Sequence, residues 1–282
     1  MRLAVYLPLI LTLLAAPGAR LLAGRCEPRL ATWLLTLSAV VLAAAGSISL
    51  ALLTVTGLLR VPELAGLGRW SLGLAERKDP VELSVAATAG LLFTLTAAAA
   101  LRRLWERCRF LARAAMDAAC LAAKDGLVIV EDPVPEAFAL PGRPGRIVVS
   151  TGMLEVLDPS EHGALLAHER AHLADHHYAF VALAQLAAAA NPFLRPLATA
   201  VAYTVERWAD EHAARVTGDR RGVARTVGKA ALAAHHSRSR SASAALGVLG
   251  RGGVDGNRRR VRVRVGLGQR QHVRRRGQGD RE

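Results

Sequence analysis

Cysteine is scarce in this sequence, which has only three among 282 residues. Cys26, Cys108 and Cys120 are odd in number and lack the close spacing of thiolate metal ligands. We therefore interpret them as free thiols, and a cysteine-ligated metal site is not expected.

Charge is missing from another part of the chain, because residues 30–59 contain no charged side chain. Residues 3–22 and 81–101 are also apolar, apart from Arg20 and Glu82. Each of these three segments is long enough to cross about 30 Å of hydrocarbon as a helix. The alternative for the first is a cleaved signal peptide, but its single preceding arginine and poor cleavage site favour a retained span.

Basic residues around these spans predict their orientation. Eight arginines lie near the end of the first span, before the second span or after the third: Arg20, Arg25, Arg29, Arg102, Arg103, Arg107, Arg109 and Arg113. The other side has five basic residues, whose charge nearby acidic residues partly offset. We therefore expect a multi-pass protein of the cell membrane. Its N-terminus should lie outside, and the region after residue 101 in the cytoplasm.

Residues 168–172 read His-Glu-Arg-Ala-His, within a stretch rich in alanine and leucine. On a helix, His168 and His172 project from the same face because they are four residues apart, so both imidazoles can bind one ion. Glu169 is then placed to act as a general base beside that ion. The spacing predicts a Zn²⁺ site with His168 and His172 as ligands and Glu169 as the catalytic residue.

The residues around the two histidines predict a long helix. Asp158 can serve as its N-cap, followed by Pro159 in the first position and Glu161 in the third. No proline follows until residue 192, so we expect one uninterrupted helix over residues 161–190.

A catalytic zinc ion usually has three protein ligands, so a third is needed. The metzincin pattern requires glycine and histidine where this chain has Asp175 and Tyr178, which excludes that class. A second helix, expected over residues 197–216, carries Glu206 and Asp210 on one face. We interpret Glu206 as the third ligand and Asp210 as the residue that orients one of the histidines.

These two strings, residues 166–173 and 206–210, resemble the membrane metallopeptidases of the BlaR/MecR antirepressor type, which are gluzincins, and more distantly the HtpX/Ste24 peptidases. The resemblance implies that the glutamate of the second string binds zinc and that the aspartate four residues later supports the site. Residues 139–142 and 145–152 look like the strand that runs beside the cleft in that family. The resemblance covers about residues 1–236.

The segment before the histidines is expected to connect the membrane to the site. Residues 102–124 predict an amphipathic helix that leaves the membrane. Residues 126–130 and 146–150 predict short strands, separated by loops rich in proline and glycine. A strand edge near the zinc would bind a peptide substrate in extended form through main-chain hydrogen bonds.

Four further histidines lie close to these motifs in the sequence: His162, His176, His177 and His212. A surplus histidine near a zinc-binding helix is more often solvated or supporting than a ligand. Among the four, we rank His176, which is one turn beyond His172, and His212 as the alternates for the metal.

The C-terminal segment is strongly basic and rich in arginine, glycine and serine. Residues 238–282 contain 13 arginines and three acidic residues, which account for ten of the net +14 charges. We expect disorder there. The family would continue with an apolar segment that returns to the membrane, and residues 237–282 do not provide one. A lipid or nucleic-acid tether, a solvated tail and an out-of-frame translation all stay open, with the last slightly favoured.

The sequence thus predicts a mainly α membrane protein in three parts. Three N-terminal transmembrane helices occupy residues 1–101, a small α+β zincin-like metallopeptidase domain occupies residues 102–236, and a disordered basic tail follows at 237–282. We expect a zinc endopeptidase that cleaves cytoplasmic or membrane-proximal proteins, and the resemblance implies regulatory proteolysis of a repressor as one role. Only about twenty residues separate the second and third spans, so no extracellular sensor domain is expected. The alternative is a catalytically silent membrane scaffold with a basic tail that binds lipid or nucleic acid.

Overall fold

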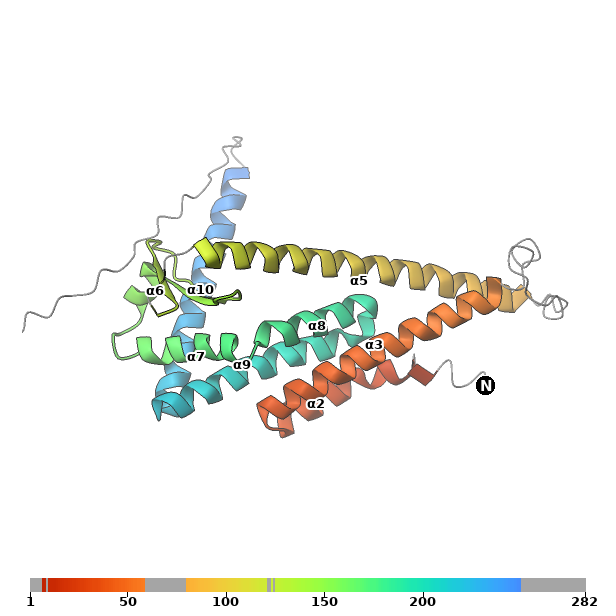
Figure 1. Cartoon of the computed structure of the whole chain (residues 1–282), viewed down its shortest axis with the longest axis horizontal. Coiled ribbons are helices and arrows are strands. Elements are labelled where there is room, and N and C mark those ends of the chain that lie inside the picture. The colour runs from red at the N-terminus through yellow and green to blue at the C-terminus, as the bar shows by residue number, and fades with distance from the viewer. Residues whose placement is uncertain (1–6, 9, 59–79, 121–122, 124, 250–282) are drawn as a thin grey trace, which may run out of the picture.

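The computed structural model describes residues 7–8, 10–58, 80–120, 123 and 125–249, and gives only the backbone for residues 57–58, 80–82 and 238–249. Most of this chain is helical (Figure 1). A three-stranded sheet lies towards one end of the molecule, and two long helices extend to the other end, of which α5 (Pro80–Cys120) also reaches the sheet side (Figure 1).

The two long helices are α3 (Pro28–Leu58) and α5 (Pro80–Cys120), which contact each other and converge where α3 ends and α5 begins (Figure 1). Their segments Pro28–Thr56 and Leu83–Cys120 are long and apolar enough to cross a membrane. The span predicted at residues 30–59 therefore corresponds to α3. The span predicted at 81–101 and, up to Cys120, the amphipathic helix predicted at 102–124 form one continuous helix, α5; residues 121–122 and 124 lie outside the described part.

The first predicted span, at residues 3–22, looks different from the other two. Its described part includes a short 3-10 helix, η1 (Thr12–Leu14), and the 11-residue helix α2 (Ala15–Arg25), which packs beside α3. Residues 3–6 and 9 of this prediction lie outside the described part. A third transmembrane helix stays a prediction.

Small side chains on one face of α3 form the centre of the helical core. Ala31, Leu35, Ala39 and Ala43 are spaced four residues apart and are all buried. They pack in one cluster with residues of α8 (His177–Ala190) and α9 (Arg195–Thr217), two helices joined by η3 (Pro192–Leu194). Because alanine lets helix axes approach closely, α8 fits between α3 and α5 and contacts both (Figure 1).

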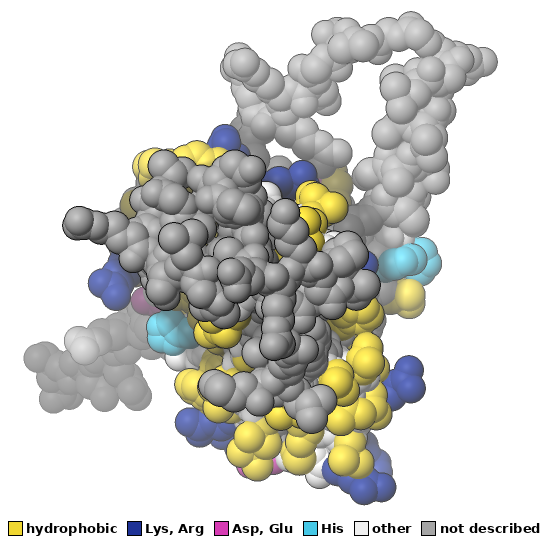
Figure 2. All heavy atoms as spheres, turned by 90° about the vertical axis from the view of Figure 1, so that its right-hand side faces the viewer, with side chains coloured by type: hydrophobic (Ala, Val, Ile, Leu, Met, Phe, Trp, Pro, Cys, Tyr) yellow, Lys and Arg dark blue, Asp and Glu magenta, His cyan; other side chains and the backbone are white. Residues whose placement is uncertain are grey.

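The outer faces of α3 and α5 are apolar and exposed. The exposed side chains include Leu30, Leu34, Leu37, Val41, Ile48, Leu52, Leu91 and Leu95. In the view from the end where α3 and α5 converge, apolar side chains cover much of the lower surface (Figure 2). Water does not stabilise such a continuous apolar surface, so these faces indicate contact with lipid or with another apolar surface.

The sheet has the strand order β1-β3-β2. Strand β1 (Leu127–Val130) runs parallel to the central strand β3 (Arg146–Ser150), and β2 (Ala137–Leu140) runs antiparallel to it. The two strands predicted at 126–130 and 146–150 are thus β1 and β3, whereas β2 was not predicted from periodicity. Among the described strands, β2 pairs only with β3, which leaves its second edge free.

Helix α7 (His162–Ala174) carries both histidines of the motif, but its ends differ from the prediction. Its N-cap is Glu161, and Asp158 lies in a turn before the helix, where its backbone N–H donates to the Glu161 carboxylate at 2.9 Å. The predicted single helix over residues 161–190 is wrong, because His176 has a left-handed backbone with φ of 52° and separates α7 from α8. Neither glycine nor proline marks this break.

Three helices complete the fold around α7. The short helix α6 (Thr151–Val156) follows β3 directly, and the Ser150 hydroxyl caps it by accepting from the Met153 N–H. Helix α9 matches the prediction at 197–216 within two residues and ends at Gly218, which has φ of 71°. Helix α10 (Arg220–Leu249) contacts α6, α7 and α9. Its backbone is helical over residues 238–249, where we predicted disorder, and residues 250–282 lie outside the described part.

Candidate metal and active site

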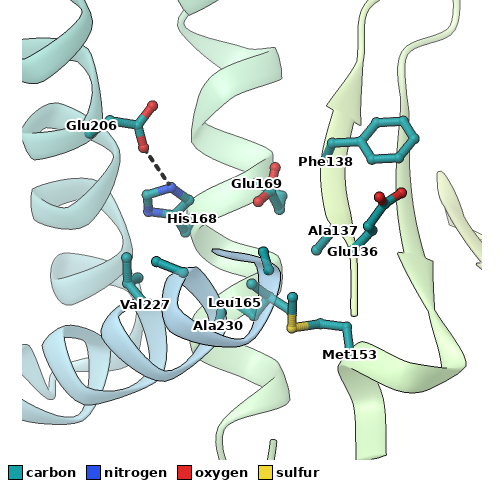
Figure 3. Close-up of a pocket in the computed structure, with 12 residues that line it drawn as sticks. Glu136, Ala137, Phe138, Met153, Leu165, His168, Glu169, Glu206, Val227 and Ala230 are labelled. Carbon is teal, nitrogen blue, oxygen red and sulfur yellow. Dashed lines mark ion pairs between the residues drawn. The ribbon is translucent and has the colours of Figure 1, made fainter. Parts of the chain in front are cut away.

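Three predicted ligands converge at one point between α7 and α9. The Nε2 atoms of His168 and His172 lie 3.1 Å apart. Oε2 of Glu206 lies 3.8 Å from Nε2 of His172 and 3.4 Å from Nε2 of His168, and Figure 3 shows this second pair. Tetrahedral zinc ligands about 2.0–2.1 Å from the ion lie roughly 3.3 Å from one another, so the spacing fits zinc. Within the described part of the chain, these three side chains form the group that could hold a metal ion. Two imidazoles and one carboxylate are a donor set that zinc accepts.

Close packing of α7 against α9 and α10 brings the ligands together. Ala164 and Ala167 of α7 are buried in one cluster with Ala213 of α9 and Val223 of α10. These small residues let α7 and α9 approach, so that the imidazoles of α7 face the carboxylate of α9. His168 is buried, whereas the Glu206 side chain is 60% exposed and lies on the open side of the site.

Asp210, which we expected to orient one of the histidines, lies behind His168. Its Oδ1 atom is 3.0 Å from Nδ1 of His168, and in the described part of the chain neither of these buried atoms has another hydrogen-bond partner. Burial opposes the charged form of His168, but the contacts with Asp210 and Glu206 outweigh it and raise the pKa of His168 to about 9. Asp210 can therefore hold Nδ1 of this ring, which leaves Nε2 to face the ligand group.

Glu169 lies next to the ligands and against the sheet. Its carboxylate is buried between His168 and β2, where it accepts a backbone hydrogen bond from Ala139 (Figure 3). Burial raises the pKa of Glu169 above its ordinary value, although the charge of His168 and the bond from Ala139 oppose the shift. A carboxylate with a raised pKa is a better proton acceptor near neutral pH.

A cleft runs past these residues on both sides. One cavity of about 490 Å³ extends towards α10, and its apolar wall includes Met153, Leu165, Val227 and Ala230 (Figure 3). A second cavity of about 430 Å³ extends towards α5 and α8, and its wall includes Arg107, Pro141, Tyr178 and Val181. Both cavities are also lined by Phe138, His168, Glu169 and Glu206. Sequence reasoning named none of the apolar wall residues, because they come together only through long-range packing.

The two alternates that we ranked highest do not join the ligand group. His176 is exposed at the N-cap of α8, and Nδ1 of His212 lies 3.6 Å from Oδ2 of Asp175. His162 contacts the backbone oxygens of Leu154 and Leu157 through its Nε2 atom.

His177 is the additional histidine that the structure brings into the site. Its Nδ1 atom lies 3.1 Å from Nδ1 of His172, and its ring packs on Trp208 with 4.6 Å between the ring centres. Burial and the neighbouring His172 lower the pKa of His177 to about 3, so the ring is neutral. The sequence offered only its nearness to the motif, which did not distinguish it from His176.

Comparison with known proteins gives a match that covers the site residues on α7 but not those on α9. The family model of peptidase family M48 matches residues 102–194, which include α7 with His168, Glu169 and His172. The match ends before Glu206 and Asp210. No curated protein and no solved structure matches the chain. Residues 102–194, about a third of the chain, are thus similar to peptidase family M48.

Proposed function

We propose that this chain is a membrane-anchored, zinc-dependent endopeptidase that hydrolyses cytoplasmic or membrane-proximal proteins. One observation carries the proposal. Nε2 of His168, Nε2 of His172 and Oε2 of Glu206 lie within 3.1–3.8 Å of one another beside the buried carboxylate of Glu169.

Each residue of the site has a distinct role in this proposal. His168, His172 and Glu206 hold the zinc, which when bound polarises the scissile carbonyl and acidifies water. Glu169 takes a proton from the attacking water and returns it to the leaving amine. Asp210 accepts the Nδ1 proton of His168 and keeps that ring in the tautomer that binds through Nε2.

The shape of the cleft favours an internal peptide segment as the substrate. The edge of β2 that has no strand partner in the described chain lies beside Glu169, which accepts from Ala139, so an extended peptide can add to the remaining main-chain groups of this edge. The two cavities extend from the ligand group in different directions, one towards α10 and the other towards α5 and α8. A cleft that continues on both sides of the scissile bond suits an endopeptidase.

Membrane anchoring rests on α3 and α5, the two helices that are long and apolar enough to span a bilayer. The arginine-rich half of α5, beyond residue 101, leads towards the sheet and α7 (Figure 1). The positive-inside bias therefore favours a cytoplasmic site close to the membrane surface. Such a location suits repressor proteolysis of the BlaR/MecR type, which stays part of the proposal.

The test uses the full-length protein in detergent and its Glu169→Gln variant. The wild type should bind one zinc per chain, measured by atomic absorption, and cleave casein in a reaction that a chelator stops. Glu169→Gln should keep the zinc and lose at least about 100-fold in cleavage rate, because it removes the proton acceptor. Glu155→Gln, at an exposed position on α6, is the matched control and should behave as the wild type.

Two outcomes would contradict the proposal. Chelator-sensitive cleavage that persists in Glu169→Gln would mean that another group is the base. A wild-type protein that binds no zinc would exclude a zinc peptidase altogether.

A further inference from the structure

The two ring nitrogens of His172 have different neighbours. Nε2 lies 3.1 Å from Nε2 of His168 and faces the ligand group, whereas Nδ1 lies 3.1 Å from Nδ1 of His177. The rings of His172 and His177 meet edge to face, with 4.9 Å between their centres and an angle of 86°. His177 therefore contacts His172 on the side opposite to the ligand group.

The left-handed turn at His176 makes this contact. In an uninterrupted helix, a residue five positions after His172 would project about 140° away from it. The φ of 52° at His176 ends α7, and α8 begins at His177, so the His177 ring folds back onto His172. A left-handed backbone is uncommon for a residue that carries a side chain, so the surrounding contacts must hold this turn.

Hydrogen-bond chemistry assigns the protons in this pair. In a hydrogen bond between two imidazoles, one nitrogen carries the proton and the other accepts it. If His172 offers the lone pair of Nε2 to a metal, its proton is on Nδ1. Nδ1 of His177 must then be the acceptor, and the His177 proton is on Nε2.

Packing alone does not explain a histidine at position 177. The residue is only 1% exposed, and its Nε2 atom has no hydrogen-bond partner within the described chain. A buried N–H without a partner is destabilising, and a phenylalanine could pack on Trp208 without that cost. The imidazole therefore provides something that an apolar ring would not, and its contact with His172 is the one that uses a nitrogen.

We infer that His177 is a positioning residue that accepts the Nδ1 proton of His172 and so fixes this ring to bind the metal through Nε2. The inference rests on the proposed zinc site and adds to it. The two histidine ligands then have different partners behind them, the carboxylate of Asp210 for His168 and a neutral imidazole for His172. Partners of this kind set the tautomer and the orientation of a ligand ring.

The experiment measures zinc affinity of the full-length protein in detergent by competition with a chromophoric chelator. His177→Phe keeps an aromatic ring on Trp208 but removes the acceptor, and zinc should bind about 10–100-fold more weakly. His177→Asn places a carbonyl oxygen near the position of Nδ1 and should restore most of the affinity. His235→Phe, at an exposed histidine of α10, is the control and should leave the affinity unchanged.

Two further measurements separate this role from a structural one. Thermal unfolding of the metal-free protein should show His177→Phe to be at least as stable as the wild type. The visible absorption bands of the cobalt(II)-loaded protein should shift in His177→Phe and return in His177→Asn. Wild-type zinc affinity in His177→Phe would overturn the inference and leave the proposed peptidase standing. Failure of the wild type to bind zinc would overturn both.

Discussion

Helices α7 and α9 contribute to the same site, but the chain specifies their positions in different ways. On α7, two ligands and the proposed base lie within five consecutive residues, so one helical turn sets their spacing. On α9, Glu206 and Asp210 are also one turn apart, but their carboxylates reach His168 only because α9 packs against α7. The family match includes α7 and ends one residue before α9 begins.

The N-terminal helices α2 and α3 hold α9 in place. Thr32 of α3 donates a hydrogen bond to the hydroxyl of Thr204 at 2.9 Å, and Arg207 donates to the backbone oxygen of Ala23 in α2 at 2.8 Å. The Arg29 guanidinium lies 5.6 Å from the centre of the Trp208 ring. The residues that flank Glu206 on α9 thus contact helices that precede the matched region. The positions of Glu206 and Asp210 in the proposed metal site therefore depend on the N-terminal part of the chain.

The strongest test of this comparison is to remove the ligand from α9 without disturbing the helix. Glu206→Gln keeps the shape of the side chain, and because that side chain is 60% exposed, the free energy of unfolding should change little. Zinc affinity should fall by more than the roughly 100-fold that loss of a supporting partner can cost. Chelator competition and thermal unfolding of the metal-free protein measure the two effects. Unchanged zinc affinity would mean that α9 supplies no ligand.

A second prediction concerns the packing that fixes α9. Trp208 is 5% exposed and contacts Phe180 and His177, so Trp208→Ala should cost about 3–5 kcal/mol of unfolding free energy. Zinc affinity should fall as well, because Glu206 and Asp210 lie two residues away on either side. Trp105→Ala on α5, where the side chain is 63% exposed, is the control and should stay within about 0.5 kcal/mol.

The two effects of Trp208→Ala can be separated by experiment. Denaturant unfolding gives the stability change, and chelator competition gives the zinc affinity of the folded protein. A variant that is less stable but binds zinc as the wild type does would show that Glu206 and Asp210 keep their positions without the packing of Trp208.

The elements that could be predicted from the sequence are those with a local signal. Residues 30–59 lack charge, and α3 spans nearly the same residues. Gly218 marks the end of α9, and the spacing of four residues identified both pairs, His168 with His172 and Glu206 with Asp210. The structure then brings Glu206 within 3.4 Å and Asp210 within 3.0 Å of His168.

The features that escaped prediction depend on contacts distant in sequence or on an unmarked turn. His176 adopts a left-handed conformation without glycine or asparagine at that position, so the break between α7 and α8 had no local signal. Without the break, His176 and not His177 would be one turn beyond His172, which is why the ranking of the alternates favoured it. Strand β2 reads Ala-Phe-Ala-Leu and has no β-branched residue, in contrast to Leu-Val-Ile-Val of β1, so its pattern did not predict a strand. Only the resemblance pointed to this region, through residues 139–142, and pairing with β3 makes it a strand.

The smallest expected effect concerns the hydrogen bond between α3 and α9. Both hydroxyls are buried, and each has a further partner within its own helix: Thr32 contacts the backbone oxygen of Pro28, and Thr204 that of Val201. In Thr32→Val and in Thr204→Val, the remaining hydroxyl therefore keeps a hydrogen-bond partner. Each variant should lower the unfolding free energy by only about 0.5–1 kcal/mol. The double variant should cost less than the sum of the two, by a coupling energy of about 0.5 kcal/mol or more. Strict additivity in denaturant unfolding would show that the Thr32–Thr204 bond contributes nothing to holding α9. Arg207, Trp208 and the apolar packing of α9 would then join it to the N-terminal helices.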